Sequence, residues 1–263
     1  MDRNLKRNIS IHNKIAKKYN SHHLEIYNAI EQTRLKKELK NCIKKIHTKS
    51  YKLKAFDFGC GTGNLTKHLL DLGFNVTSAD VSLKSLELVD INYATKNLST
   101  LLLEDGSLSK VKDNSFDLVA TYSVLHHITD YINACKELVR ICKPGGIIFI
   151  DHERNNDFWS NKPEYKLFLK NARKFDLKKY LRLSNYYNKF LRLFNPRHTN
   201  EGDIHVWHDD HIEWDLIKSE TSETTSIIRE KDYLLYSDIY KKDVFETYEG
   251  KISDTKLLIL RKN

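Results

Sequence analysis

Three glycines and three aspartates of this 263-residue chain have the types and spacing of a ligand site. Gly59, Gly61 and Gly63 lie in the stretch KAFDFGCGTGNL, directly after an apolar run. Glycines at the end of a strand permit a tight turn and the close approach of a ligand, and the helix that follows offers free N–H groups and a positive dipole end. We therefore predict a ligand-binding loop, because a plain strand-to-helix turn would need only one glycine.

Each aspartate has its own place relative to this loop. Asp57 precedes the glycines, where a carboxylate is unfavourable beside a pyrophosphate but suits an ammonium or sulfonium group. Asp80, in TSADVS, can accept hydrogen bonds from both hydroxyls of a ribose, since the alternative role of helix N-cap is better filled by Ser82. Asp105, in EDGS, can accept from the exocyclic amine of adenine or form a turn before Gly106. Together they predict a pocket for an adenine nucleoside without a phosphate.

These residues can meet only if a parallel sheet brings several strand ends to one edge. From Tyr51 onward, strand-like runs alternate with helical patterns, with strands expected in LKAFDFG, FNVTSAD, LSTLLLED, SFDLVATYS and IIFIDHE. Helices are expected over about 64–72, 83–95 and 130–142. The alternation predicts an α/β fold with a doubly wound parallel sheet covered on both faces.

The segments that flank this core add further elements. Residues 9–46 have apolar residues at helical spacing and no proline, which indicates two helices before the first strand. About seventy residues separate IIFID from the next strand, TTSIIRE (224–230), and they must contain helices, because so long a structureless loop is improbable in a compact domain. A last strand is expected in DTKLLILRK, and YLLYSDIY is a further candidate strand.

The motifs resemble, in order and at the usual intervals, those of class I S-adenosylmethionine-dependent methyltransferases. The resemblance rests on DFGCGTGNLTKHL, VTSADVS, LLLEDGSL, NSFDLVATYSVLHHITD and LVRICKPGGIIFIDHE, within about residues 51–153. It implies a Rossmann-like, seven-stranded, mostly parallel sheet with the last strand antiparallel, and S-adenosylmethionine as the cofactor. The stretch IAKKYNSHHLEIYNAIEQTRL is similar to the N-terminal helical lid of small-molecule members.

The resemblance divides the chain into four parts. We expect an N-terminal helical lid (1–50), a cofactor-binding core (51–153), a helical cap insertion over the acceptor site (154–210) and a C-terminal part of the core sheet (211–263). The cofactor cleft is then expected at Tyr19, Asp57, Gly59, Cys60, Gly61, Gly63, Asp80, Val81, Asp105, Gly106, Tyr122 and Ser123. Asp57 and the glycine loop would lie near the methionine moiety, Asp80 on the ribose, and Asp105 with Gly106 on the adenine.

Three histidines are candidates for a catalytic base. A sulfonium methyl is already electrophilic, so the protein has mainly to align the nucleophile, exclude water and, where needed, take up a proton, without any metal. His126 and His127 follow the fourth strand in YSVLHHITD, and His152 follows the fifth in DHER. Neutral imidazole is a suitable base near pH 7. The alternatives are packing for the histidine pair and a solvated turn for DHER.

The stretch DIHVWHDDHIEWD has three histidines and two aspartates between positions 205 and 211 that invite a metal interpretation. Asp210 followed three residues later by Glu213 resembles a helix-start capping box, which uses the same residues without a metal. We therefore predict no metal site, and a polar contribution to the acceptor pocket is the other alternative.

The net charge of +9 is concentrated in two segments. Residues 1–54 hold 15 Lys and Arg against 4 Asp and Glu, and residues 158–198 hold 11 against 2, so the rest of the chain is acidic. The second segment interleaves its charges with aromatic residues, which fits a nucleic-acid surface, an acidic membrane surface or a helical cap over an anionic or aromatic acceptor. Its position after the fifth strand favours the cap.

The predicted function is methyl transfer to a small or medium-sized acceptor, including an anionic one. The alternatives are an RNA methyltransferase and a non-catalytic scaffold or sensor that binds S-adenosylmethionine. The sequence TYSVLHH replaces the Asn/Asp-Pro-Pro-aromatic motif of enzymes that methylate base amines, which disfavours nucleic acid. A nicotinamide oxidoreductase is disfavoured because the glycine spacing is G-x-G-x-G and not G-x-G-x-x-G.

We expect a cytoplasmic protein. The N-terminus has no apolar region of the kind that a signal peptide needs, and no window approaches 18 uncharged apolar residues. Cys42, Cys60, Cys135 and Cys142 occur singly, without CxxC spacing, which predicts free thiols.

Overall fold

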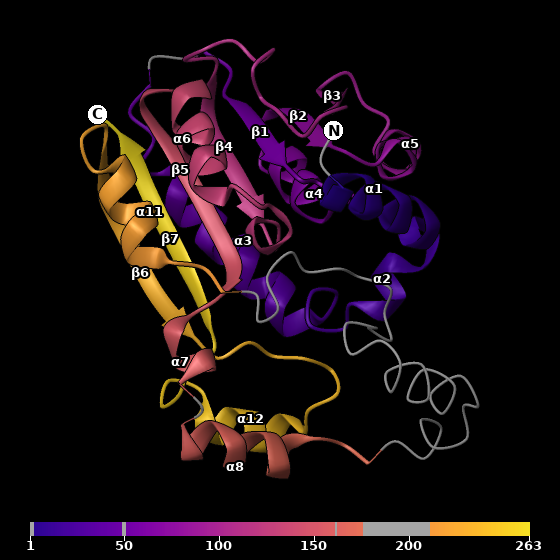
Figure 1. Ribbon diagram of the computed structural model, residues 1–263, viewed down its shortest axis with the longest axis vertical. Coiled ribbons are helices and arrows are strands. Elements are labelled where there is room, and N and C mark those ends of the chain that lie inside the picture. The colour runs from indigo at the N-terminus through magenta and orange to yellow at the C-terminus, as the bar shows by residue number, and fades with distance from the viewer. Residues whose placement is uncertain (1–2, 49–50, 161, 176–210) are drawn as a thin grey trace.

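A computed structural model describes residues 3–48, 51–160, 162–175 and 211–263. In these residues seven strands form one sheet in the order β3-β2-β1-β4-β5-β7-β6 (Figure 1). The strands are β1 (Lys54–Phe58), β2 (Asn75–Asp80), β3 (Leu98–Leu102), β4 (Phe116–Tyr122), β5 (Cys142–Arg154), β6 (Thr225–Tyr233) and β7 (Thr255–Lys262). Strands β1 to β5 pair in parallel, whereas β7 is antiparallel to both of its neighbours, β5 and β6. The predicted fold class, a doubly wound, mostly parallel seven-stranded sheet with an antiparallel last strand, is confirmed.

Helices cover both faces of this sheet (Figure 1). They are α1 (Arg3–Ile15), the 3₁₀ helix η1 (Ala16–Lys18), α2 (Tyr19–His22), α3 (Ala29–Ile43), α4 (Asn64–Asp71), α5 (Leu83–Asn92), the 3₁₀ helix η2 (Leu125–His127), α6 (Tyr131–Ile141), α7 (Asn156–Trp159), α8 (Pro163–Ala172), α11 (Trp214–Thr221) and α12 (Lys242–Tyr248). Successive strand residues point to opposite faces, so β5 sends Ile148 toward α6 and α11 and Phe149 toward α3 and α4. The continuous apolar runs of the sequence reflect this burial on both faces.

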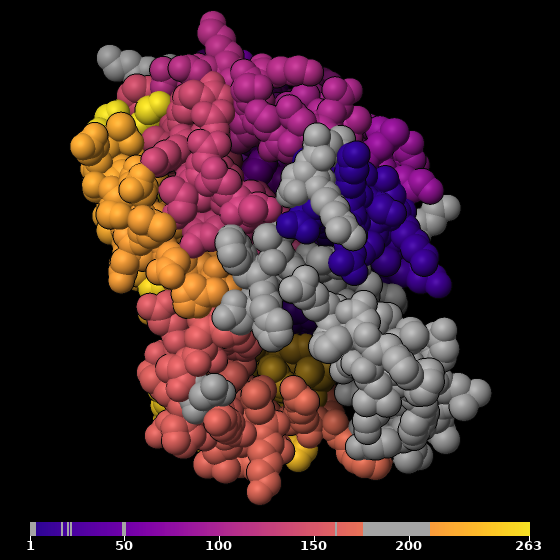
Figure 2. Space-filling model, viewed as in Figure 1, coloured from indigo at the N-terminus to yellow at the C-terminus, as the bar shows by residue number. Residues whose placement is uncertain are grey.

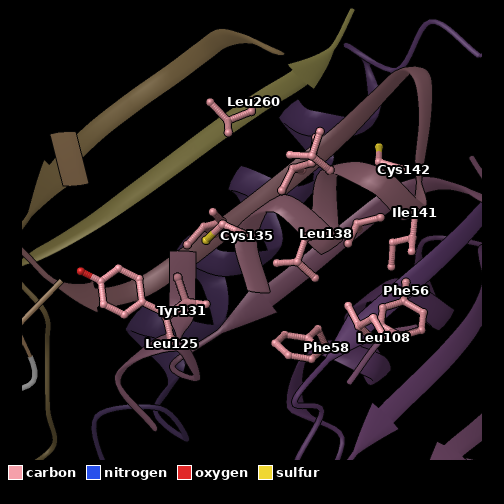
Figure 3. Packing of buried hydrophobic residues seen from close by; sticks show 14 of the residues in the cluster. Phe56, Phe58, Leu108, Leu125, Tyr131, Cys135, Leu138, Ile141, Cys142 and Leu260 are labelled. Atoms are coloured by element: carbon pink, nitrogen blue, oxygen red, sulfur yellow. The ribbon is translucent and has the colours of Figure 1, made fainter. Parts of the chain in front are cut away.

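The core on the α6 side shows how a helix contributes to the sheet (Figure 3). Tyr131, Cys135 and Leu138 recur every three or four residues along α6 and are all buried against the strands. Burying one leucine side chain of this kind stabilises the fold by about 1.5–3 kcal/mol. The Asp130 side chain caps the helix by accepting a hydrogen bond from Asn133 N at 3.0 Å.

The N-terminal helices differ from the two that the periodicity predicts. Residues 3–48, the described part of the chain before β1, form four helical segments, and the long one, α3, begins only after Asn28, whose side chain accepts from Glu31 N at 2.9 Å. Helix α1 packs against α5, and Asn13 Oδ1 accepts from Ser82 Oγ at 2.8 Å and from Lys84 N at 3.2 Å. In the space-filling view the indigo N-terminal segment lies against the magenta segment that contains β2 and α5 (Figure 2). The prediction of Ser82 as a helix N-cap is confirmed, since its hydroxyl accepts from Ser85 N at 3.2 Å.

One prediction for the C-terminal part is wrong. The candidate strand YLLYSDIY does not form: β6 ends at its first residue, Tyr233, and Asp254 Oδ1 accepts from Leu235 N at 2.8 Å in place of a strand partner. A tertiary contact overrides the local sequence signal there. Asp210, the first residue of the predicted capping box, lies outside the described residues, and α11 begins at Trp214 with Glu213 as its N-cap and no side-chain cap bond.

The described start of the predicted cap insertion, residues 154–175, contains α7 and α8. Helix α8 packs on α12, with the Phe168 ring centroid 5.1 Å from that of Tyr240 and 5.5 Å from that of Tyr248. Both helices lie beyond one end of the sheet (Figure 1). Residues 176–210 of this insertion fall outside the described residues.

Gly63 is a glycine of the loop whose replacement should lower stability through both strain and packing. It has φ +93°, and a Cβ there would lie 2.5 Å from the Tyr93 ring, whereas at Gly73, with φ +86°, a Cβ would meet nothing within 4 Å. We expect Gly73→Ala to lower the unfolding free energy by about 1 kcal/mol through backbone strain, and Gly63→Ala by a further 1–2 kcal/mol or so through overpacking. Urea unfolding of both variants measures this difference, and equal losses would contradict the packing argument.

Candidate active site

A cavity of about 640 Å³ lies at the carboxyl ends of β1 to β4 and beneath the N-terminal helices. Its volume is within the range of about 300–1,000 Å³ that small-molecule sites occupy. Ten of the twelve predicted cofactor residues line it: Tyr19, Gly59, Cys60, Gly61, Asp80, Val81, Asp105, Gly106, Tyr122 and Ser123. The structure thus brings together residues that the sequence spreads over about a hundred positions.

The glycine loop forms the floor of this cavity. Gly59 N and Cys60 N donate to Ala79 O at 2.9 and 3.0 Å, which ties the loop to the end of β2. Gly61 has φ +50°, and a Cβ there would meet nothing within 4 Å. The loop therefore presents bare backbone to the cavity, as the predicted close approach of a ligand requires.

Asp80 is fixed at the cavity wall by two backbone donors. Gly61 N donates to its Oδ2 at 2.8 Å and Ser82 N to its Oδ1 at 2.7 Å. Burial raises the pKa of Asp80, while these two hydrogen bonds favour the ionised form. Because each carboxylate oxygen has two lone pairs, both oxygens retain acceptor capacity for a diol.

Asp105 is a turn residue that also lies on the cavity wall. Its Oδ1 accepts from Ser107 N at 3.0 Å, which makes it a turn residue, and it also lines the cavity. Gly106, at φ +75°, faces Leu5 of α1, whose methyl groups lie 3.6–3.7 Å from the position of a Cβ. Leu5 belongs to the cavity wall, and nothing in its local sequence distinguishes it.

Asp57 and Gly63 do not line the cavity, and the direct electrostatic role predicted for Asp57 needs correction. Asp57 is 1% exposed and lies behind the loop, where the Thr66 hydroxyl donates to its Oδ2 at 2.6 Å. Burial raises the pKa of Asp57 to about 7. Gly63 is the N-cap position of α4. Both residues therefore shape the loop from behind.

A second cavity of about 260 Å³ adjoins the first. Tyr19, Ser123 and His127 line both cavities. The other residues that line it are His23, Glu25, His126, His152, Arg154, Leu235, Ser237, Ile239, Tyr240, Asp254 and Thr255. All three candidate base histidines are therefore on its walls, and no described residue from 155 to 175 lines either cavity.

The DHER tetrad is not a solvated turn. Strand β5 continues through it to Arg154, and Asp151, His152 and Glu153 are buried. Ser123 and His152 have φ values of +61° and +65°, and Ser123 N donates to Asp151 O at 3.0 Å, so two strained positions lie side by side at the ends of β4 and β5. Strain of this kind in residues other than glycine concentrates at functional sites.

The histidines differ in their surroundings. His126 pairs through Nδ1 with Glu153 at 2.7 Å, and its ring lies 4.0 Å from that of His127. The His127 ring in turn lies 5.5 Å from His12 of α1. Burial, assisted by the Arg154 and Arg34 charges, lowers the pKa of His152 well below its usual value.

A buried ionic network lies beneath the site, and no sequence motif indicated it. The Arg34 guanidinium of α3 donates from Nε to Glu31 at 2.8 Å and from Nη2 to Asp151 at 2.7 Å. Tyr122 donates to Glu31 at 2.8 Å and Tyr233 to Asp151 at 2.9 Å. Burial raises the pKa of both carboxyls, and Arg34 opposes this rise. The network joins α3 to β4, β5 and β6 at the carboxyl edge.

Comparison with known proteins identifies a domain within this architecture. Residues 56–150 match the family model described as a methyltransferase domain. These residues carry a methyltransferase domain, and S-adenosylmethionine is the cofactor of the class I methyltransferases whose motifs they resemble. The resemblance predicted from the motifs is thereby confirmed.

Two curated relatives illustrate the match. The ubiquinone biosynthesis O-methyltransferase of Caulobacter vibrioides is 32% identical over 107 residues, which are 37% of this chain and 40% of that protein. The demethylmenaquinone methyltransferase of Staphylococcus haemolyticus is 33% identical over 136 residues, which are 50% of this chain and 56% of that protein. The matched regions thus span about two fifths to just over half of these relatives.

Solved structures share the fold over nearly the whole chain. An S-adenosylmethionine-dependent methyltransferase from Anabaena variabilis has a TM-score of 0.60 at 16% identity and covers 98% of this chain and 95% of its own. A related protein from Listeria monocytogenes has a TM-score of 0.55 at 14% identity, covering 87% of this chain and 98% of its own. These likenesses establish the fold.

Two features are absent from the described residues. No group of three or more His, Cys, Asp or Glu side chains in them has the arrangement of a metal site, and most of the histidine-rich stretch 203–215 lies outside them. None of their helices combines the length and apolar composition that a membrane crossing requires.

Replacement of Asp57 by asparagine tests its burial. Its pKa is about 7 in the folded protein and about 3.9 in the unfolded chain, so the wild type loses stability as the pH rises from about 4 to about 7. In Asp57→Asn this loss disappears, so over that pH range the variant should gain about 4 kcal/mol of unfolding free energy relative to wild type. Urea unfolding over a pH series measures the trend, and Asp71→Asn, at an exposed position, is the control.

Removal of Arg34 should be far more damaging than removal of a surface cation. Arg34→Met leaves two buried carboxyls without their counter-charge, so we expect a loss of about 3–5 kcal/mol. Lys67→Met, which breaks an exposed ion pair with Asp71, should lose about 0–1 kcal/mol. Chemical unfolding compares the two, and similar losses would show that the network is not the support described here.

Proposed function

We propose that this protein is an S-adenosylmethionine-dependent methyltransferase with a small-molecule acceptor. The observation that carries the proposal is the meeting of two cavities at Tyr19, Ser123 and His127. The larger cavity has the acids and bare backbone that suit a methionine-bearing adenosine, and the smaller one is lined by histidines. A methyl group would pass between them across this junction.

The residues of the larger cavity suit each part of the cofactor. When bound, S-adenosylmethionine supplies an electrophilic methyl group. Asp80 would accept hydrogen bonds from the ribose hydroxyls, and Asp105 would accept from the adenine amine. Leu5 and His12 of α1 and the Tyr19 ring would exclude water from above.

The smaller cavity favours a neutral acceptor over a strongly anionic one. The guanidinium of Arg154 lies 3.0 Å from the Asp254 carboxylate, and Glu25 lines the same cavity. The positive charge of Arg154 is therefore already balanced by nearby carboxylates. The curated relatives are named for ubiquinone biosynthesis and for demethylmenaquinone methylation, which supports a small organic acceptor. Because the matches cover only about two fifths to just over half of these relatives, the acceptor and the activity of the whole chain belong to this proposal.

The remaining assignments form part of the same proposal. We retain the division into a lid (1–50), a core (51–153), an insertion (154–210) and a C-terminal part (211–263), in which the lid contributes walls to both cavities. All four cysteines are free and buried, which suits the cytoplasmic location that we propose. The histidines His126, His127 and His152 are the candidates for the base.

Asp80→Ala tests cofactor binding. Loss of a charged acceptor for the ribose should weaken S-adenosylmethionine binding about 10- to 100-fold in titration calorimetry. Asp71→Ala, a matched change at an exposed position, should bind as the wild type does. Unchanged affinity of Asp80→Ala would contradict the assignment of the larger cavity.

Transfer of labelled methyl groups to a small-molecule extract tests the activity. We expect wild type to label a low-molecular-weight product and Asp80→Ala to label none. Cofactor binding without transfer to any extract fraction would favour the scaffold or sensor alternative. Label that is lost on nuclease treatment would favour an RNA methyltransferase.

A further inference from the structure

We propose that a third cavity, between α3, the end of β6 and α12, binds an uncharged aryl carbonyl compound, and that its occupancy strengthens cofactor binding in the larger cavity. None of the described residues that line it belongs to either of the other two cavities. The binding site goes beyond the proposed function, and only its effect on the cofactor rests on that function.

The third cavity has the size and the apolar surface of a small-molecule site. Its volume is about 380 Å³, within the range of about 300–1,000 Å³ that such sites occupy. The rings of Tyr236 and Phe245 lie 4.9 Å apart at 75°, so the wall offers both a face and an edge to an aromatic ring. The apolar and aromatic side chains of this wall are Ile30, Tyr233, Leu234, Tyr236, Phe245 and Ile252.

Arg34 supplies an unused hydrogen-bond donor at this cavity. Its Nε donates to Glu31 at 2.8 Å and its Nη2 to Asp151 at 2.7 Å, and its Cζ lies 4.1 Å from the centre of the Tyr233 ring. Among the described lining residues, its Nη1 is the one buried side-chain polar atom without a hydrogen-bond partner. A buried donor without an acceptor is unfavourable, so a ligand that presents an oxygen to this guanidinium would satisfy it.

The charges around Arg34 favour an uncharged ligand. The guanidinium already contacts the carboxyls of Glu31 and Asp151, so the carboxylate of a ligand would be a third negative group on one positive group. An ammonium group would be repelled by the guanidinium itself. A carbonyl oxygen has two lone pairs and accepts from Nη1 without adding any charge.

The other ions that line the cavity have partners of their own. Lys231 Nζ lies 3.8 Å from Glu38, and Lys256 Nζ lies 3.2 Å from Asp232. Asp157 accepts from the Ser253 hydroxyl at 2.9 Å. Two exposed residues of opposite sign, Glu249 and Lys251, complete the charged part of the wall. The wall therefore has no excess of positive charge that would select an anion.

The ionic network connects this cavity with the larger one. Tyr122, which lines the larger cavity, donates to Glu31 at 2.8 Å. Ser123, which lines both of the other cavities, donates from its backbone N to Asp151 O at 3.0 Å. A ligand that completes the hydrogen bonds of Arg34 restricts both carboxyls that hold these residues. Cofactor binding then has less motion to arrest, so the two ligands should strengthen each other's binding.

Calorimetric titration of the full chain saturated with S-adenosylhomocysteine tests the ligand class, because saturation keeps the probe out of the larger cavity. We expect benzamide, an uncharged aryl carbonyl, to bind. Benzoate, which has the same size and a negative charge, and benzylamine, which is protonated at neutral pH, should bind about tenfold more weakly or worse. Absence of benzamide binding, or equal binding of benzoate, overturns the site.

Two matched substitutions test the location of the bound probe. Ile30→Trp fills the third cavity and should abolish benzamide binding. Ile239→Trp places the same bulk at the smaller cavity, at a position 44% exposed, and should leave benzamide binding unchanged. The reverse result would put the probe in the smaller cavity and overturn the site.

A second variant keeps this test decisive if Ile30→Trp does not fold, as judged by thermal unfolding. Phe245→Leu removes one ring of the wall and should weaken benzamide binding about threefold. Unchanged affinity in Phe245→Leu would then overturn the site.

The effect on the cofactor is measured by titration of S-adenosylhomocysteine with and without saturating benzamide. We expect the affinity of wild type and of Ile239→Trp to rise about fivefold, and that of Ile30→Trp to stay unchanged. Unchanged affinity in wild type overturns the effect of the third cavity on the cofactor.

The outcomes separate the inference from the proposed function. Failure of wild type to bind S-adenosylhomocysteine overturns the proposed function and the coupling that rests on it. Benzamide titration of the chain without S-adenosylhomocysteine then decides the site, since loss of binding in Ile30→Trp supports it and retention overturns it. Normal S-adenosylhomocysteine binding without benzamide binding overturns only the inference.

Discussion

A positive charge buried between two carboxylates is the constraint on which the site depends. Arg34 reaches Glu31 on its own helix and Asp151 at the end of β5, and two tyrosines complete the network from β4 and β6. A buried charge of this kind must remain paired, so α3 can occupy only one position relative to the strand ends. That position anchors the C-terminal end of the N-terminal segment, and the contacts of α1 with α5 hold its other end over the larger cavity.

The sequence predicted the parts of the site that depend on local chain geometry. Glycines at a strand end and acids at successive strand ends could be read in order, because in a parallel sheet these ends meet at one edge. Sequence-based prediction failed where contacts with residues distant in the sequence set the position of a side chain. Asp57 has the spacing of a ligand contact, but its carboxylate accepts a hydrogen bond from Thr66 and lies behind the loop. Leu5 and Arg34 have no local signature, since their partners are about a hundred residues away.

The histidines show the same division. Their positions after β4 and β5 made them candidates, and the structure gathers them on one cavity wall. What the sequence could not supply was the contact that distinguishes them, because Glu153 and His126 are 27 residues apart and become neighbours only through strand pairing. A solvated turn was the alternative for DHER, and the tetrad proved to be a buried continuation of the strand IIFIDHE.

The walls of the two cavities extend well beyond the domain shared with other methyltransferases. Residues 56–150 contain the glycine loop and the acids, whereas Tyr19, His152 and Arg154 lie outside that range. Residues 56–150 alone would contact one side of the nucleoside and would leave the acceptor cavity open. Two proteins with closely similar sequences over this domain can therefore enclose different acceptors, and sequence identity within the domain does not predict the acceptor.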